Sequence, residues 1–253
     1  MNVLGVIPAR MGATRFPGKP MARVLGLTMV EHVYRRAMLA KGLTDLYVAT
    51  CDQEIYDAVV RFGGRPLMTS DRHVRACDRV AEAAGQVGGD ADFVVNVQGD
   101  EILLRPEAID LLCQAMADDP TADSYNLVAE ITTEEGFLDP NQPKVVCDVK
   151  GYVMYMSREP IPTMRHLGLN IPKYRQMGLM GFTRAFMKIY GELPPTPLEQ
   201  AEAIDMDRVI EHGYRIKAVV SSYDSPMVDV PADLEIVERL MRDDALAKEY
   251  LRS

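Results

Sequence analysis

The chain of 253 residues is 47% hydrophobic and 26% charged, which is ordinary for a globular protein that buries a sizeable core. Its formal net charge of -9 excludes a general nucleic-acid or membrane-surface binder, because an acidic surface repels both partners. The 4 cysteines are far apart and form no metal-binding pattern, so we expect reduced thiols. Since no leader-like or membrane-spanning apolar stretch is present, the sequence predicts a cytoplasmic protein.

The first half of the chain alternates short β-branched runs with helical periodicity. Strands are expected over residues 3–7, 45–50, 65–69 and 92–97. Helices are expected over residues 29–40, 53–62, 77–86 and 106–117. This alternation predicts an α/β fold in which a mainly parallel sheet is covered by helices on both faces, with right-handed crossovers.

The second half breaks this rhythm. Strand-like runs at residues 125–131, 144–149 and 151–156 are closely spaced, so we expect antiparallel pairing there. Further elements are expected after a proline-rich loop: strands at 176–182 and 215–220, helices at 183–191 and 198–213, and a terminal helix with Pro231 in its first turn and a solvated end. No repeat or linker divides the chain, so we predict one domain over residues 1–253.

The first predicted strand runs into the loop PARMGATRFPGKP, residues 8–20. The loop holds three cations and two glycines: Arg10, Arg15, Lys19, Gly12 and Gly18. Glycines let backbone N–H groups approach an oxyanion while Arg and Lys neutralise its charge, so the loop is typical of a polyphosphate site. It matches neither the P-loop nor the dinucleotide-binding pattern, and a solvated basic turn is the alternative interpretation.

The segment VVNVQGDE, residues 94–101, ends an apolar strand with two adjacent carboxylates, Asp100 and Glu101. Such a pair suits a hard cation, since Mg²⁺ prefers one or two carboxylates together with phosphate oxygens. The alternative is an acidic pair preceding the helix that opens at Pro106. In SPMVDVPADLE, Asp229 precedes a predicted helix, and taken alone it is more typical of an N-cap than of a metal ligand.

Three segments in this order, IPARMGATRFPGKP, VVNVQGDE and VDVPADLE, resemble the nucleotide-sugar cytidylyltransferases, and most nearly the 3-deoxy-manno-octulosonate (Kdo) cytidylyltransferase family. The similarity extends to MVEHVYRRA, LYVATCD, YMSREPIP and PPTPLEQAE, and so covers almost the whole chain. It implies a Rossmann-like nucleotidyltransferase sheet. It also implies metal-dependent transfer of CMP from CTP to an acidic sugar, with release of pyrophosphate, as in nucleotide-sugar and lipopolysaccharide biosynthesis.

The resemblance implies roles for individual residues. Arg10 and Lys19 would bind the triphosphate, and Asp100 and Asp229 would hold Mg²⁺. Arg10, Lys19 and Asp100 would therefore form the catalytic set, in which charge neutralisation and in-line positioning replace a covalent nucleophile. Three more residues are implied to lie against CTP: Gly12, Arg15 and Arg79.

The acceptor region departs from the family pattern. RHVRACDR stands here for DHxSGTxR, QMGLMGF for HIGIYGY, and IDMDRVI for LEQLRVL, and the proline of QGDEP is replaced by Ile102. Because a site built for hydroxyl groups discriminates strongly when its partners change, these departures predict an altered acceptor preference. The resemblance places Gln98 against the acceptor, with the altered residues Arg75, Gln176, Met180 and Asp205 around it.

Three further side chains carry open interpretations. His73 and His166 lie in polar loops where either could meet an anionic substrate, although a solvated loop histidine is the alternative. Cys77 sits close to the predicted site, but no activating base accompanies it in the sequence, so we expect no catalytic thiol.

We therefore predict a Mg²⁺-dependent cytidylyltransferase that uses CTP and Kdo or a related 3-deoxy ulosonic acid. Two alternatives stay open: the same transfer to a different small acid such as a phosphonate, and a non-catalytic regulatory protein that binds nucleotides. Because residues 150–190 form a dimer contact in the family, the resemblance implies a homodimer. No nucleic acid, membrane or protein partner is indicated, and the sequence does not fix the acceptor.

Overall fold

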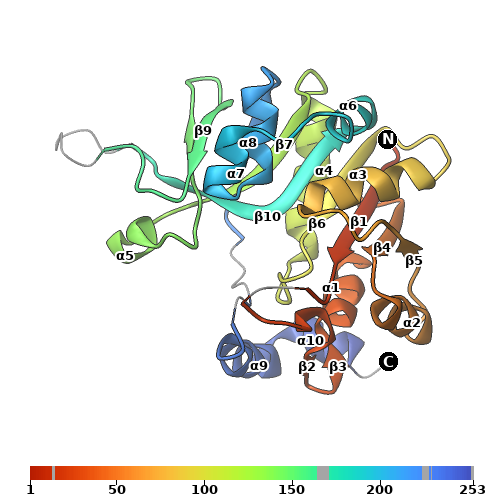
Figure 1. Ribbon diagram of the computed structural model, residues 1–253. Coiled ribbons are helices and arrows are strands. Elements are labelled where there is room, and N and C mark those ends of the chain that lie inside the picture. Colours follow the sequence, from red (N-terminus) through yellow and green to blue (C-terminus); the bar gives the residue numbers. More distant parts are fainter. Residues whose placement is uncertain (13–14, 164–170, 224–227, 229, 252–253) are drawn as a thin grey trace.

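The computed structural model describes residues 1–12, 15–163, 171–223, 228 and 230–251 (Figure 1). In this part of the chain nine strands form one sheet, whose main path has the order β11-β7-β10-β6-β1-β4-β5. The main-path strands are β1 (Val3–Ala9), β4 (Asp45–Thr50), β5 (Pro66–Met68), β6 (Phe93–Val97), β7 (Ser124–Glu130), β10 (Tyr174–Thr183) and β11 (Ile216–Ser221). A hairpin of β8 (Lys144–Cys147) and β9 (Val153–Ser157) extends from β10.

The sheet is parallel on one side and mixed on the other. Strand β1 pairs in parallel with both β4 and β6, and β4 pairs in parallel with β5. Strand β10 runs antiparallel between β6 and β7, while β11 is parallel to β7. The predicted mainly parallel α/β sheet is therefore confirmed. Of the antiparallel pairing expected among the closely spaced runs, β8 pairs with β9, whereas β7 pairs antiparallel with β10 instead.

Helices cover both faces of the sheet (Figure 1). Their bounds are α1 (Met29–Ala37), α2 (Gln53–Arg61), α3 (Ala76–Gln86), α4 (Pro106–Asp118), α5 (Glu134–Leu138), α6 (Arg184–Tyr190), α7 (Pro197–Glu202), α8 (Asp205–Glu211), α9 (Asp233–Asp243) and α10 (Ala245–Tyr250). Three short elements follow the first loop: the 3-10 helix η1 (Lys19–Met21) and the hairpin strands β2 (Arg23–Val24) and β3 (Leu27–Thr28).

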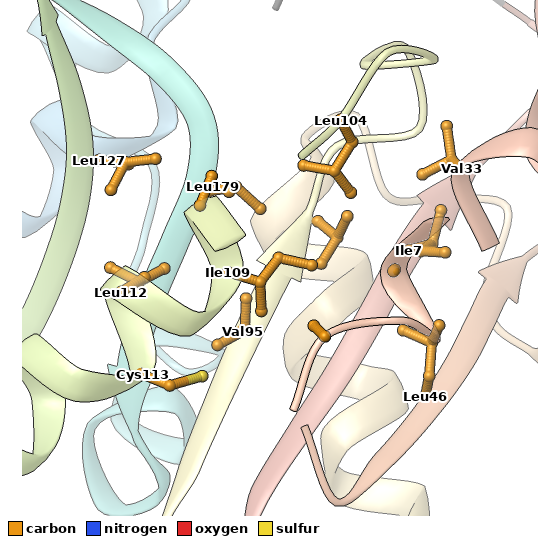
Figure 2. Close-up of a cluster of buried hydrophobic side chains, with 14 of the residues drawn as sticks. Ile7, Val33, Leu46, Val95, Leu104, Ile109, Leu112, Cys113, Leu127 and Leu179 are labelled. Atoms are coloured by element: carbon orange, nitrogen blue, oxygen red, sulfur yellow. The ribbon is translucent and has the colours of Figure 1, made fainter. Parts of the chain in front are cut away.

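Two core clusters explain this layering, because successive residues of a strand point to opposite faces. Val3 and Ile7 of β1 pack with the apolar sides of α1, α2 and α4. Figure 2 shows Ile7 of this cluster together with Val33 of α1 and Ile109 of α4. Leu4 and Val6 of the same strand pack with α3, α6 and α8 on the opposite face. A buried central strand of this kind reads as a nearly continuous apolar run, which is why β1 is recognisable in the sequence.

A third core cluster lies apart from the sheet. Helices α9 and α10 contribute Val237, Met241, Ala247 and Tyr250 to this cluster. These side chains pack against residues from four other places, namely the β2–β3 hairpin, α1, the loop after β6 and the loop before α9: Val24, Met29, Ile102 and Val228. The expectation that the chain ends in a solvated helix is wrong, since Ala247 and Tyr250 are buried. The terminal helices therefore form part of the support under the carboxyl end of the sheet.

The long helix expected over residues 198–213 is also corrected, because two helices, α7 and α8, stand there. Ala203 between them has φ 56°, in the left-handed region. The carboxylate of Glu202 accepts hydrogen bonds from Tyr155, Ser157 and the amide of Arg158 on the β9 side. Its carbonyl oxygen accepts from Arg158 Nε at 2.6 Å. These contacts hold the end of α7, and the next helix, α8, begins at Asp205.

Smaller differences concern element ends. Helix α1 ends at Ala37 rather than at residue 40, and α9 begins at Asp233, so that Pro231 precedes its first turn. The 4 cysteines are all unpaired, as expected. In the described ranges no helix combines the length and apolar character that a bilayer crossing requires.

Candidate active site

Two adjoining cavities open where β1 and β6 end. Each has a volume of about 350 Å³. They share the wall formed by Arg10, Arg15, Val74, Arg75, Ala76, Gln98 and Asp100. The first cavity continues toward Phe16, Lys19 and Arg79, and the second continues toward Gln176, Met180 and Asp205. Ligand sites of open α/β sheets lie at this edge, so the sequence-predicted residues converge where a bound substrate is expected.

The loop after β1 is folded back on itself by its own backbone. Gly18 has φ 74°, a conformation that favours glycine, and its amide donates to Met11 O at 2.9 Å. The amide of Met11 donates to the carboxylate of Asp52 at 2.8 Å, which ties the loop to the end of β4. Arg15 lines the second cavity, where its Nη1 donates to Asn141 Oδ1 at 2.9 Å.

Lys19 and Asp100 form the closest pair of opposite charges on the wall of the first cavity. Lys19 Nζ donates to Asp100 Oδ2 at 3.0 Å and to Val228 O at 2.6 Å. The amide of Val228 donates in turn to Asp100 O at 3.3 Å. The three residues come from η1, the loop after β6 and the loop before α9, so the pair joins three distant segments of the chain.

The second carboxylate oxygen of Asp100 fits a cation. Asp100 Oδ1 is buried and has no hydrogen-bond partner among the described residues. A buried carboxylate oxygen that no donor satisfies is an oxygen ligand for a hard cation such as Mg²⁺. The described residues contain no group of three or more Asp, Glu, His or Cys side chains that could hold a metal by themselves.

Glu101 does not join Asp100 at the cavity wall. Its side chain is 2% exposed, and its Oε1 accepts the amide of Gly178 on β10 at 2.6 Å. A Cβ at Gly178 would lie 2.6 Å from Glu101 Oε1, so this approach requires glycine. The two adjacent carboxylates therefore have different structural roles. Asp100 lines the cavities, and Glu101 binds the loop after β6 to β10.

Arg79 lies deep in the wall of the first cavity. One terminal nitrogen, Nη1, contacts Thr69 Oγ1 and Ser70 O. The other, Nη2, is buried and has no hydrogen-bond partner among the described residues. A guanidinium fixed on one edge and unsatisfied on the other can bind a ligand at no further ordering cost to the protein.

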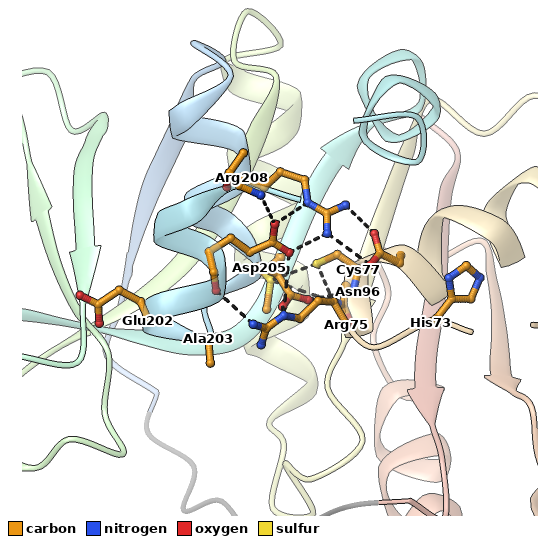
Figure 3. A network of polar contacts seen from close by, with 12 residues as sticks. His73, Arg75, Cys77, Asn96, Glu202, Ala203, Asp205 and Arg208 are labelled. Carbon is orange, nitrogen blue, oxygen red and sulfur yellow. Dashed lines mark hydrogen bonds and ion pairs between the residues drawn. The ribbon is translucent and has the colours of Figure 1, made fainter. Parts of the chain in front are cut away.

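Four of the residues that depart from the family pattern contact one another at the second cavity: Arg75, Cys77, Met180 and Asp205. Figure 3 shows Arg75, Cys77 and Asp205 of this group. The amide of Cys77 donates to Asp205 Oδ2 at 2.9 Å, so α8 supplies the carboxylate that caps α3. Cys77 Sγ lies 3.9 Å from Met180 Sδ on β10. Arg75 Nε is 3.9 Å from Asp205 Oδ1. Burial raises the pKa of both Cys77 and Asp205, with the Cys77 amide and Arg75 opposing the shift at Asp205.

A buried ion network stands behind these residues. Arg208 of α8 pairs with Glu199 of α7 at 2.6 Å and with Asp78 of α3 at 2.6 Å. Arg75 completes the network, because its Nη2 donates to Glu199 O at 3.1 Å. The guanidinium of Arg75 is thus held from behind by two carboxylates while it lines both cavities. Figure 3 shows Arg75 and Asp205 turned toward each other, with His73 directed away.

Two polar residues in the wall of the second cavity, Arg158 and Asn141, were not picked out from the sequence. Arg158, at the end of β9, is held by Pro140 O at 3.0 Å and by the Glu202 carbonyl, and it lines the second cavity. Asn141 holds Arg15 from the same side. The arginine lies in YMSREPIP, a segment that carries the family resemblance, so weighing each charged residue of that segment would have found it.

The remaining predicted positions are placed in different ways. Gly12 is not part of either cavity wall. Asp229 and His166 lie outside the described residues. His73 lines the first cavity but is paired with Glu82 of α3. Gln176 lines the second cavity and donates from Nε2 to Asn126 Oδ1 at 2.7 Å.

Comparison with known proteins bears on the same cavities. The cytidylyltransferase family profile matches residues 4–217. A 3-deoxy-manno-octulosonate cytidylyltransferase of Desulfosudis oleivorans is 40% identical over 242 residues, covering 95% of this chain and 98% of the relative. An 8-amino-3,8-dideoxy-manno-octulosonate cytidylyltransferase of Shewanella piezotolerans is 43% identical over 240 residues, covering 94% of this chain and 98% of the relative.

A solved structure extends the similarity to three dimensions. The structure of CMP:2-keto-3-deoxy-manno-octonic acid synthetase complexed with CTP superposes with a TM-score of 0.89 at 36% identity, covering 96% of this chain and 99% of the other. The resemblance inferred from the three sequence segments is confirmed by these matches over nearly the whole chain. The chain belongs to the cytidylyltransferase family.

Proposed function

We propose that this protein transfers CMP from CTP to a 3-deoxy ulosonic acid, either Kdo or its 8-amino derivative, and releases pyrophosphate. The observation that carries the proposal is the position of Asp100, which lines both cavities and presents a buried carboxylate oxygen without a donor. A phosphoryl transfer between two bound substrates needs its charge-neutralising groups at their boundary. Asp100 occupies that boundary, with Lys19 beside it.

The first cavity is suited to the triphosphate. Arg10, Arg15 and Lys19 line it together, and guanidinium and ammonium groups bind phosphate oxygens through charge-assisted hydrogen bonds. Lys19 is held by Asp100 and Val228, so its position is set before the nucleotide binds. Arg79 offers a further donor deeper in the same wall. These residues bind and orient the phosphates rather than react with them.

The cation would be held by Asp100. Asp229 is the second ligand that the resemblance implies, and it lies outside the described residues. Mg²⁺ bound there would neutralise phosphate charge and orient the acceptor hydroxyl for in-line attack. Asp100 would hold the ion, Arg10 and Lys19 would fix the phosphates, and no covalent nucleophile from the protein is required.

The second cavity is suited to an anionic acceptor. Among its described lining residues, four guanidinium groups face two carboxylates: Arg10, Arg15, Arg75 and Arg158 against Asp100 and Asp205. Arginine recognises carboxylates through paired hydrogen bonds, so an acid is favoured over a neutral sugar. Gln98 and Gln176 add amide groups for hydroxyls. Relatives of both acceptor types are similarly close to this chain, which supports Kdo and its 8-amino derivative equally.

The test is release of pyrophosphate from CTP and Mg²⁺, with Kdo, 8-amino-Kdo, other ulosonic acids and small phosphonates assayed in parallel. We expect release that depends on one or both of the first two acids. Release with a phosphonate alone would keep CMP transfer but replace the acceptor. CTP binding without release for any acid would favour the regulatory nucleotide-binding alternative.

We also propose that the chain forms a homodimer through residues 150–190, as the resemblance implies. Two apolar side chains of this segment are exposed and open to a partner: Met154 on β9 is 60% exposed and Ile171 is 49% exposed. Light scattering should give about twice the mass of one chain, and Met154→Lys should lower it toward that of the monomer if the hairpin forms the contact.

A further inference from the structure

A cluster of buried polar side chains on α1 lies outside both cavities. His32 and Arg36, one helical turn apart, are both 0% exposed. Arg36 forms an ion pair with Asp244 at the start of α10 and donates from Nη1 to Leu104 O at 3.1 Å. Its Nε donates to the hydroxyl of Tyr250 at 3.3 Å. Because a buried guanidinium is costly unless it is paired, these contacts fix α10 and the loop after β6 on α1.

Each hydrogen bond between His32, Tyr250 and Arg36 has a defined donor and acceptor. His32 Nε2 lies 2.8 Å from Val24 O, which can only accept, so Nε2 carries the proton. Burial lowers the pKa of His32 and so favours the neutral ring, in which Nδ1 is an acceptor. The Tyr250 hydroxyl, 2.8 Å away, donates to it. The hydroxyl oxygen in turn accepts from Arg36 Nε. Removing the Tyr250 hydroxyl therefore breaks two links between α1 and α10.

The elements held by this cluster carry the cation end of the site. Ile102, two residues beyond Asp100, packs with Val228, Val237 and Met241 in the core cluster under the terminal helices. Val228 is joined to Asp100 through its amide and to Lys19 through its carbonyl oxygen. In Figure 1, α9 and α10 lie beside the β2–β3 hairpin beneath the loops of the site. The terminal helices and the Lys19–Asp100 pair thus share one rigid support.

We propose that Arg36 and Tyr250 are positioning residues for this site: through α10 and Leu104 they hold Val228 and the Asp100 loop so that Lys19 and Asp100 are placed before CTP binds. The inference rests on the proposed use of CTP. It predicts that loosening the cluster weakens nucleotide binding far more than acceptor binding, since Lys19, which the cluster helps to place, lines the first cavity and not the second.

The experiment is Tyr250→Phe, which removes one hydroxyl and keeps the ring. Titration calorimetry with CTP alone, in EDTA and again in Mg²⁺, measures binding without turnover. We expect the dissociation constant of CTP to rise roughly three- to tenfold, the size expected for buried hydrogen bonds that preorganise a site. Hydrogen exchange at the Val228 amide should quicken in the same variant, while the KM of the acceptor stays within about twofold of wild type.

The matched control is Tyr125→Phe. Tyr125 is also 0% exposed, and its hydroxyl donates to Asp119 O, remote from both cavities. The control should lose stability without any change in CTP affinity. Equal CTP affinity in Tyr250→Phe and wild type, or equal weakening in the two variants, would overturn the positioning role. Failure of wild-type protein to bind CTP would instead reject the proposed function.

Asp244→Asn supplies a second variant. An asparagine keeps the oxygen that accepts the Ala247 amide at the start of α10, but it removes the charge opposite Arg36. We expect weaker CTP binding here as well, with the same unchanged KM for the acceptor. If CTP affinity is retained in this variant while the protein stays folded, the ion pair is structural only and the proposal fails.

Discussion

The two ends of the site are built in different ways. At the proposed phosphate end, Lys19 and Asp100 come from compact sequence segments and are held by backbone groups and by a buried cluster beneath them. At the proposed acceptor end, Arg75, Met180 and Asp205 come from three distant segments and are placed by contacts among their side chains. The first arrangement therefore depends largely on backbone groups, whereas in the second a change at one side chain alters the contacts of the others.

The largest effect should follow Asp100→Asn, which tests the phosphate end directly. The amide keeps the shape of the side chain but removes the charge beside Lys19 and the carboxylate oxygen that fits a cation. We expect turnover to fall by about two to three orders of magnitude or more, as when a charge-stabilising group is removed from an active site. Pyrophosphate release measures turnover, and calorimetry with CTP measures the binding that should remain.

Asp110→Asn is the control for that substitution. Asp110 accepts the amide of Gly42 at 2.7 Å and lies in neither cavity wall. Its variant should retain wild-type turnover. If Asp100→Asn also retained it, Asp100 would be removed from the cation role and the comparison between the two ends would lose its main support.

Arg75→Ala addresses the acceptor end. The substitution removes a guanidinium that lines the second cavity and leaves Glu199 and Asp205 without one of their counter-charges. We expect the KM of the acceptor to rise by roughly five- to twentyfold, the range of one charge-assisted hydrogen bond. Arg75→Lys should recover only part of the loss, because lysine lacks the planar fork. A rise in the KM of CTP alone would instead assign Arg75 to the phosphate end.

The same contrast explains how much could be predicted from the sequence. The β1 loop and the β6 end are local patterns, so the position of Arg10, Lys19 and Asp100 at the carboxyl edge of the sheet could be predicted from the sequence. The β/α alternation likewise predicted the sheet, because buried parallel strands read as apolar runs. The break at Ala203 could not be predicted, since it depends on hydrogen bonds between Glu202 and the distant strand β9. No local signal records such a contact.

The terminal helices are a second case in which local sequence patterns did not reveal a tertiary contact. The charged residues of the last segment suggested a solvated helix, yet Tyr250 is 7% exposed and Asp244 pairs with the buried Arg36. A helix that contributes a few apolar side chains to a small separate core has too short a pattern for its buried face to be identified from sequence alone. The division of Asp100 and Glu101 between two tasks similarly required the position of Gly178.

His32, beneath the proposed phosphate end, and Asp207, near the proposed acceptor end, should change the stability of the fold in opposite directions with pH. Burial, and then the charges of Arg36 and Arg35, lower the pKa of His32, while the Val24 carbonyl and Glu31 oppose the shift. Folding therefore favours neutral His32, and stability should fall as pH drops below about 6.5 toward the lowered pKa. Burial and the neighbouring Glu202 raise the pKa of Asp207 on α8 to about 7. Folding favours the protonated form of Asp207, so the contribution of Asp207 to the free energy of unfolding should fall as pH rises from about 4 to 7.

Urea unfolding at pH 5, 6, 7 and 8 would separate these contributions. Relative to wild type, Asp207→Asn should gain stability with rising pH, by at most about 1.4 kcal/mol per pH unit up to pH 7. The stability deficit of His32→Gln should shrink as pH falls below 6.5, because wild type alone loses the contribution of neutral His32. Parallel curves for the variants and wild type would show that neither group titrates with unfolding.

The smallest effect is expected for Cys77→Ser, because the acceptor end should place groups without reacting. Burial raises the pKa of this thiol, and a buried protonated thiol is a poor nucleophile. Serine retains an acceptor for Asn96 Nδ2, which lies 3.4 Å from Cys77 Sγ. Turnover at saturating substrates should therefore stay within about twofold of wild type, and iodoacetamide should not inactivate the native protein through Cys77. A loss of several orders of magnitude with unchanged KM values would mean that the thiol takes part in the reaction, and the chemistry would then no longer lie at the phosphate end alone.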